Sequence, residues 1–270
     1  MLNRRKDMLS SSIKSIDFVK SVEIVPSRES GTEDLLKAAD MLDGRVNALT
    51  CPENPRGSPG IDPIMALYII SSERNIIPIP HITPRDKNRV YILSQIETAA
   101  KVGIRNFFTI GGDPINPKYE SREVREIDVM EIMKLVKSRE NTTVGAALNP
   151  YREVEQEIVG AKLKSGADFF ISQAIYSPEY LEKDWIRRRN FKLLAGFLPL
   201  TKKSQVKFSQ NLGIMIPEEI RERLLNSDDI VSTSVRIITE VFDEVKEYVD
   251  GIHIMPLGHN EVAAQILETI

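Results

Sequence analysis

The chain has 270 residues, of which 41% are apolar and 28% charged, a balance typical of a folded globular protein. Lys and Arg number 36 against 39 Asp and Glu, and the net charge of −3 predicts no nucleic-acid partner. No apolar run reaches the roughly 18 residues that cross a bilayer, so we expect no membrane partner. Its one cysteine, Cys51, excludes an internal disulfide and favours a cytoplasmic location. With only three histidines besides, all scattered, we predict no metal site.

Short apolar runs rich in Val, Ile, Phe and Ala recur along the whole chain. Such runs are typical of buried parallel strands. The eight predicted strands are Val22–Val25, Val46–Cys51, Ile76–Ile82, Asn106–Ile110, Thr142–Ala147, Ala167–Ile175, Lys192–Leu198 and Gly251–Met255.

Stretches with helical periodicity lie between and after these strands. The predicted helices are Glu33–Leu42, Arg89–Val102, Val129–Val136, Val154–Ser165, Pro178–Arg189 and Asn260–Thr269. The long gap between the seventh and eighth strands carries three more, Lys203–Leu212, Pro217–Leu225 and Ser234–Val249.

This alternation predicts an α/β fold, a single (β/α)8 TIM barrel over residues 1–270 with extra helices between strands seven and eight. The alternative is an open doubly wound sheet, which usually carries a glycine-rich phosphate turn after its first strand. Here Pro26-Ser27-Arg28 follows the first strand, and no G-x-G-x-x-G occurs. We therefore prefer the barrel.

Active sites of such barrels lie at the carboxyl ends of the strands. Glu23 belongs to an apolar strand, where burial raises a carboxyl pKa, so it is either a general acid or one half of a salt bridge. After strand four, Gly111 and Gly112 allow a tight turn that projects Asp113. A simple Gly-Asp-Pro turn is the alternative.

Other strand ends carry polar side chains of less specific meaning. Thr50 is either a ligand donor or a strand-end cap, and His81 is either a ligand contact or a hydrogen-bonded core residue. Gln173 ends an apolar strand, and its amide can donate and accept at once, which suits a heterocycle. His253 and His259 have no assigned role.

Six segments together resemble the methylenetetrahydrofolate reductase family. They are SVEIVPSRE, HITPRD, GIRNFFTIGGDP, KLKSGADFFISQAIY, LLAGFLPLTKKSQ and GIHIMPLG, in the family's order and over nearly the whole chain. The resemblance implies a (β/α)8 flavoprotein of one-carbon metabolism. Its reaction would reduce 5,10-methylenetetrahydrofolate, or a related tetrahydropterin, to the 5-methyl form. The hydride would pass from NAD(P)H through the flavin to the methylene carbon.

The resemblance also implies roles for individual residues. Glu23 would be the catalytic acid, and Asp113 would lie near both flavin and pterin. The implied substrate-binding residues are Glu23, Asp113, Gln173 and Gln205. The implied flavin-binding residues are Thr50, His81, Gly112, Asp113, Ala147 and Lys162, with Lys162 pairing with the flavin phosphate.

Two segments that help to hold FAD in the best-studied members differ here. Gly111 replaces an arginine, and Ala147-Leu148-Asn149-Pro150-Tyr151 replaces a longer Tyr-Pro-x-x-His-Pro-Glu loop. The chain resembles the acetogen-like branch, some of whose members carry FMN and work with partner subunits. The flavin we expect is FAD, and the alternative is FMN. We expect the chain to form a homo-oligomer, and the alternative is an assembly with electron-transfer subunits. Other candidate functions are a pterin-binding methyl-transfer protein and a non-catalytic subunit of a one-carbon complex.

Overall fold

Eight parallel strands in chain order close into a barrel in the computed structural model, which describes residues 11–270. The strands are β1 (Val19–Glu23), β2 (Ala48–Cys51), β3 (Ile77–Ile82), β4 (Asn106–Thr109), β5 (Thr143–Leu148), β6 (Phe169–Ala174), β7 (Lys192–Phe197) and β8 (Gly251–Ile254). Strand β8 pairs with β1, for example through Val19 and Gly251, so the sheet has no free edge. The predicted barrel is confirmed, and the open-sheet alternative is wrong.

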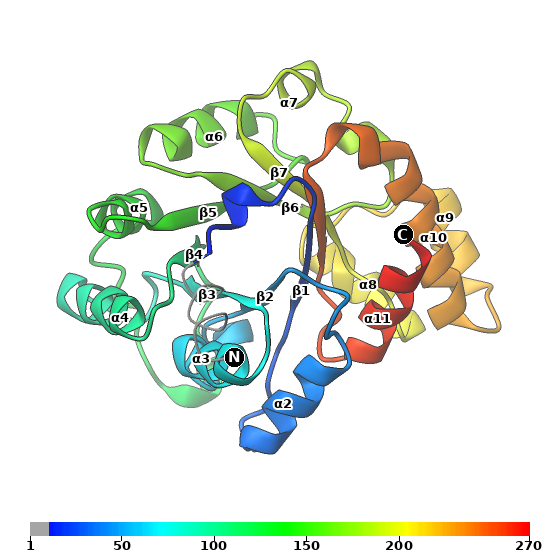
Figure 1. Ribbon diagram of the computed structural model, residues 1–270. Helices are drawn as coiled ribbons and strands as arrows, with labels where there is room; N and C mark the ends of the chain where they lie inside the picture. The colour runs from blue at the N-terminus through cyan, green and yellow to red at the C-terminus, as the bar shows by residue number, and fades with distance from the viewer. Residues whose placement is uncertain (1–10) are drawn as a thin grey trace.

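Helices surround the barrel (Figure 1). They are α2 (Thr32–Asp40), α3 (Pro63–Glu73), α4 (Arg89–Lys101), α5 (Val129–Lys137), α6 (Glu155–Lys164), α7 (Asp184–Arg187), α8 (Lys203–Asn211), α9 (Glu218–Leu225), α10 (Ile230–Val245) and α11 (Asn260–Thr269). Short 3-10 turns are η1 (Ile13–Ser15), η2 (Pro55–Gly57), η3 (Pro117–Tyr119), η4 (Pro178–Tyr180) and η5 (Lys246–Tyr248). Helices α8, α9 and α10 confirm the three extra helices. None of the helices in the described range is both long and apolar enough to span a bilayer.

Three elements differ from the sequence-based expectation. Helix α3 was not predicted, because it is apolar on nearly every side and shows no one-sided stripe. Strand β1 begins at Val19, before the predicted apolar run, because backbone pairing with β8 includes polar residues. The predicted helix at Pro178–Arg189 is broken into η4 and α7, where the backbone of Lys183 is extended.

The strands turn alternate side chains into the barrel. An interior apolar cluster contains Val19, Ala48, Ile77, Ile79, Phe108, Phe169, Ile171 and Leu194, whereas neighbours such as Leu49 pack outward against the helices. Strand side chains repeat with a period of two. The same alternation therefore turns Glu23, Thr50 and His81 inward at the carboxyl ends.

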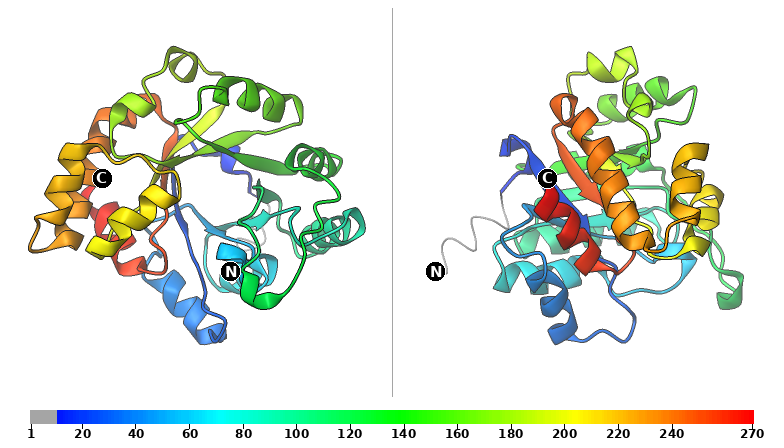
Figure 2. Two further views of the ribbon diagram at one scale, coloured as in Figure 1. Left: turned by 180° about the vertical axis from the view of Figure 1, so that it is seen from behind. Right: turned by 90° about the vertical axis from the view of Figure 1, so that its right-hand side faces the viewer.

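The segment η1 crosses the amino end of the barrel, opposite α8 (Figures 1 and 2). Ile13 is fully buried in the interior cluster. Its backbone N–H donates to Asn106 Oδ1 at 3.1 Å, and Asn106 Nδ2 donates to the Ser11 carbonyl at 2.8 Å. This closure leaves the carboxyl end as the approach for a ligand.

The contact between Asn106 and the η1 segment predicts a loss of stability in Asn106→Ala. The buried Ile13 N–H would lose its acceptor, and we expect the free energy of unfolding to fall by about 1–3 kcal/mol. Urea unfolding with an unchanged m-value measures this. The exposed Asn190→Ala serves as control, with a change within about 0.5 kcal/mol. Equal stability of the two variants would contradict a stabilising role for this contact.

Candidate active site

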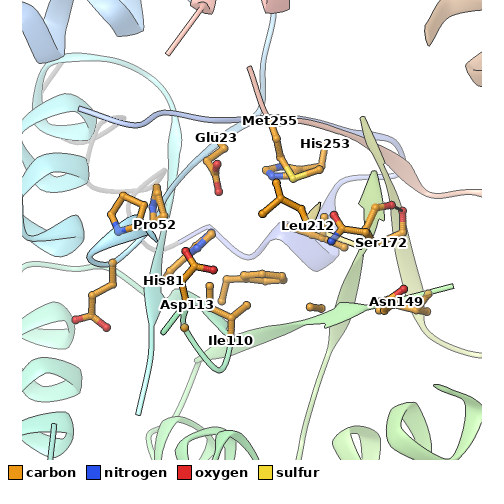
Figure 3. Close-up of a pocket in the computed structure, with 18 of the residues that line it drawn as sticks. Glu23, Pro52, His81, Ile110, Asp113, Asn149, Ser172, Leu212, His253 and Met255 are labelled. Atoms are coloured by element: carbon orange, nitrogen blue, oxygen red, sulfur yellow. Dashed lines mark hydrogen bonds between the residues drawn. The ribbon is translucent and has the colours of Figure 1, made fainter. Parts of the chain in front are cut away.

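A cavity of about 460 Å³ lies at the carboxyl end of the barrel (Figure 3). Its polar and charged lining residues are Glu23, Glu53, Arg56, His81, Asp113, Asn149, Arg152, Lys162, Ser172, Gln173 and His253. Its apolar wall includes Val25, Phe108, Ile110, Leu148, Ile171, Phe208, Leu212, Met255 and Leu257. An apolar cavity with a few convergent polar groups is typical of a small-molecule site.

Glu23 is the last residue of β1, and Asp113 lies in the loop after β4. Both side chains face this cavity (Figure 3). Removal from water raises the pKa of Glu23 from 4.5 to about 7, and the negative charge of Asp113 contributes to the rise. Glu23 therefore holds a proton for much of the time at neutral pH. A carboxyl group with that pKa is suited to general acid catalysis.

The turn that carries Asp113 depends on Gly112. Gly112 has φ of +77°, and a Cβ added there would lie 3.3 Å from Thr83 Cβ. The Asp113 carboxylate accepts the backbone N–H of Arg56 at 2.7 Å. The structure thus places Gly112 in the predicted tight turn and holds Asp113 against the loop after β2.

Two buried histidines line the cavity. Burial lowers the pKa of His81 to about 3, with His253 adding to the effect, and neither ring nitrogen of His81 has a hydrogen-bond partner within residues 11–270. Burial also lowers the pKa of His253 to about 3, and its Nδ1 lies 2.9 Å from Ser21 Oγ. Both rings are neutral at pH 7. Sequence reasoning left His253 without a role, although alternation along β8 turns it inward.

Thr50 is not among the residues that line the cavity, and its ligand contact stays a prediction. Its Oγ1 is buried and has no hydrogen-bond partner in the described part of the chain. A buried hydroxyl without a partner is costly. His81, which lines the cavity, therefore has polar atoms available to a bound molecule.

Lys162 from α6 lines the cavity beside Ala147 of β5. Lys162 is buried and donates to the Ala147 carbonyl, and burial lowers the pKa of this lysine. Arg152 also lines the cavity and carries a second positive charge near Lys162. The buried Glu155 lies 3.5 Å from Arg152 and also acts on Lys162, so it offsets part of this positive charge. Lys162 is the group here that is suited to pair with an anion.

The two predicted glutamines have different places. Gln173 lines the cavity, and its Oε1 accepts the Ala174 N–H at 3.0 Å. Gln205 does not belong to the described lining, because its Oε1 accepts the N–H groups of Thr201 and Lys202 and caps α8. Phe208 and Leu212 line the cavity there instead. Phe208 of α8 and its C-cap residue Leu212 are four residues apart, and this helical spacing is the signal that could have identified them.

The fold and the cavity define a (β/α)8-barrel protein with a cavity at the carboxyl ends of the strands, where such barrels bind their ligands. The model of one family, methylenetetrahydrofolate reductase, matches residues 8–270. The chain belongs to that family.

A curated relative and several solved structures resemble the chain. It is 24% identical over 249 residues to "Methylenetetrahydrofolate reductase 2" of Schizosaccharomyces pombe, over 78% of this chain and 39% of the relative. The chain thus spans about two fifths of that relative's length. An uncharacterised protein from Clostridium thermocellum that binds two copies of 5-methyl-5,6,7,8-tetrahydrofolic acid has a TM-score of 0.70 and 16% identity, covering 100% and 98% of the two chains. EDTA monooxygenase from Chelativorans sp. BNC1 has a TM-score of 0.53 and 12% identity, covering 93% of each chain. These structural likenesses support the barrel fold.

The raised pKa of Glu23 predicts a pH-dependent cost to stability. Because the folded state holds this proton more tightly than the unfolded chain does, ionised Glu23 destabilises the fold. The cost grows as pH rises from 4.5 to about 7 and amounts to up to about 3 kcal/mol. We expect Glu23→Gln to gain stability relative to wild type through this window.

Urea unfolding at a series of pH values measures that difference. The exposed Glu29→Gln is the matched control and should differ from wild type by a constant amount. A stability difference for Glu23→Gln that does not change with pH would show that the pKa of Glu23 is close to that of the unfolded chain.

Proposed function

We propose that this protein reduces 5,10-methylenetetrahydrofolate, or a related tetrahydropterin, to the 5-methyl form with a flavin and NAD(P)H. The observation that carries the proposal is a carboxyl group with a pKa of about 7, Glu23, beside Asp113 in the cavity. Membership of the family supports the folate substrate.

The residues of the cavity fit a flavin. The ring nitrogens of His81, which have no partner within residues 11–270, are suited to its polar edge, and Gly112 lets the backbone come close. Lys162, beside Ala147, would pair with its phosphate. FAD is our first choice and FMN the alternative. When bound, the flavin supplies the hydride that reduces the methylene carbon.

Glu23 supplies the proton for the reaction. It donates to the ring nitrogen that separates from the methylene carbon, so that the five-membered ring opens to an iminium ion. Addition of a hydride to that carbon gives the 5-methyl product, and the carboxylate of Glu23 then regains a proton from solvent. A pKa of about 7 lets the same group give and regain a proton near neutral pH.

Asp113 and Gln173 position the pterin in this proposal. The Asp113 carboxylate can accept from the N–H groups of a pterin ring, and the Gln173 amide can donate and accept. Phe208 and Leu212 would cover the ring and reduce access of water. Gln205 would join the substrate contacts only after leaving its role as the cap of α8.

An absorbance spectrum of the purified protein tests the proposal. We expect flavin bands that bleach with NADH or NADPH under anaerobic conditions and return when methylenetetrahydrofolate is added. Bands that bleach only with dithionite would indicate a partner protein as electron donor. No flavin bound or taken up, together with methyl transfer from a pterin, would contradict the proposal and favour the methyl-transfer alternative.

Glu23→Gln separates the two halves of the reaction. The amide cannot donate a carboxyl proton, so we expect normal reduction of the flavin by NADH and at least about a hundredfold slower reoxidation by methylenetetrahydrofolate. Stopped-flow absorbance measures both rates. Glu29→Gln, which is exposed, should leave both unchanged. Folate reduction within a few fold of wild type would exclude Glu23 as the acid.

Asp113→Asn tests the role of the second carboxylate. Loss of its charge should make the flavin easier to reduce and weaken pterin binding, because the carboxylate both repels negative charge and accepts hydrogen bonds. The midpoint potential, measured against a reference dye, should rise. An unchanged potential with unchanged pterin affinity would contradict this role.

A further inference from the structure

Arg85 is a charged side chain that is almost completely removed from solvent. It lies between β3 and α4, and its side chain is 1% exposed. Burying a guanidinium is costly unless it is paired and hydrogen-bonded. Arg85 makes a two-pronged pair with the next residue, from Nε to Asp86 Oδ1 at 2.7 Å and from Nη2 to Asp86 Oδ2 at 2.5 Å.

The remaining donors of Arg85 reach two other loops. Nη1 donates to the Asp113 carbonyl at 2.6 Å, and Nη2 donates to the Asn54 carbonyl at 3.2 Å. Asn54 Nδ2 in turn donates to Asp86 Oδ2 at 3.0 Å. One guanidinium thus joins the loops that follow β2, β3 and β4. Only a planar group with several fixed donors can do this, which favours Arg over Lys.

The loop that carries Asp113 is also packed tightly against the loop after β2. The Gly57 carbonyl accepts the Asn116 N–H at 3.0 Å, and a Cβ added at Gly57 would lie 1.9 Å from the Pro114 carbonyl oxygen. The Asp113 carboxylate is held from the same side by the Arg56 N–H. Arg85 itself does not belong to the described lining of the cavity. It can act on the cavity through Asp113, whose carbonyl it holds.

We propose that Arg85 is a positioning residue that fixes Asp113 in the cavity near Glu23 by tying the loops after β2, β3 and β4 together. Its importance for catalysis rests on the proposed function. The geometry itself predicts a measurable effect on Glu23 in the protein without substrate.

The groups that surround Glu23 decide the sign of that effect. They are Cys51 from β2, His81 from β3, Asp113 from the loop after β4 and His253 from β8. Burial raises the pKa of Cys51 and lowers those of both histidines, so these three are neutral at pH 7. Asp113 is the group of this set whose charge raises the pKa of Glu23. Glu53 and Arg56 of the loop after β2 also line the cavity, and Glu53 is paired with Lys87.

Loss of Arg85 therefore has two opposed consequences. If Asp113 moves away, the repulsion that raises the pKa of Glu23 weakens and that pKa falls. If Asp113 stays and only a positive charge is lost, the pKa of Glu23 rises. The direction of the change separates positioning from a direct electrostatic effect.

The test is a pH titration of the full chain, labelled with 13Cδ-glutamate and followed by NMR without ligands. Glu23→Gln identifies the Glu23 resonance. In Arg85→Met we expect the pKa of Glu23 to fall by about one unit. At a pH above the Glu23 pKa of both wild type and variant, the variant then holds about tenfold less of the acid form. Arg89→Met, at an ion pair with Glu131, is the matched control and should leave the titration unchanged.

A double-variant comparison excludes a general loosening of the fold. Asp113→Asn alone should also lower the pKa of Glu23, and adding Arg85→Met to it should lower it no further, because both changes act through the same carboxylate. Arg85→Lys, which keeps the charge but not the planar set of donors, should change it in the same direction by less. It also serves as the second variant if Arg85→Met fails to fold.

A rise or no change in the pKa of Glu23 in both Arg85 variants would overturn the proposal, as would an additive effect in the double variant. If the pKa falls but wild type reduces no pterin, the proposed function fails and the positioning role of Arg85 stands. If wild type is an active reductase and the pKa does not fall, only the positioning role fails.

Discussion

Two carboxyl groups, Glu23 and Asp113, line one cavity, and much of the local structure keeps them there. Glu23 is fixed by the barrel itself, because it ends strand β1, which pairs with β2 on one side and with β8 on the other. Asp113 lies on a loop and has no such support. Its place depends on Gly112, on the Arg56 N–H and on the hydrogen bonds that Arg85 makes.

This arrangement has a cost in stability that the rest of the barrel must offset. A carboxyl group with a raised pKa weakens the fold at neutral pH, and buried polar atoms without partners, such as those of Thr50 and His81, add to the cost. Within residues 11–270, the apolar interior cluster and the η1 segment at the amino end contain none of these groups. The structure therefore separates a stabilising end of the barrel from a reactive end.

Particular residues show how far sequence reasoning reaches. Glu23 and His81 were identifiable because a period of two in an apolar strand decides which way a side chain points. Gly112 and Asp113 were identifiable because a left-handed turn needs glycine. Arg85 was missed, because its role depends on partners from three loops. Gln205 stays a predicted substrate contact, and its bonds to Thr201 and Lys202 are local ones that cap α8.

The sequence by itself determined the barrel, the order of its elements and the end at which the site lies, since these follow from strand spacing, helix periodicity and local turns. It did not reveal helix α3, whose all-round apolar composition hides its period. Only the tertiary structure decided which polar groups near the cavity have no hydrogen-bond partner in the described residues and which are bonded to other parts of the protein. The reason is physical, because hydrogen bonding and desolvation depend on what the folded chain brings within about 3 Å, and those neighbours come from different loops.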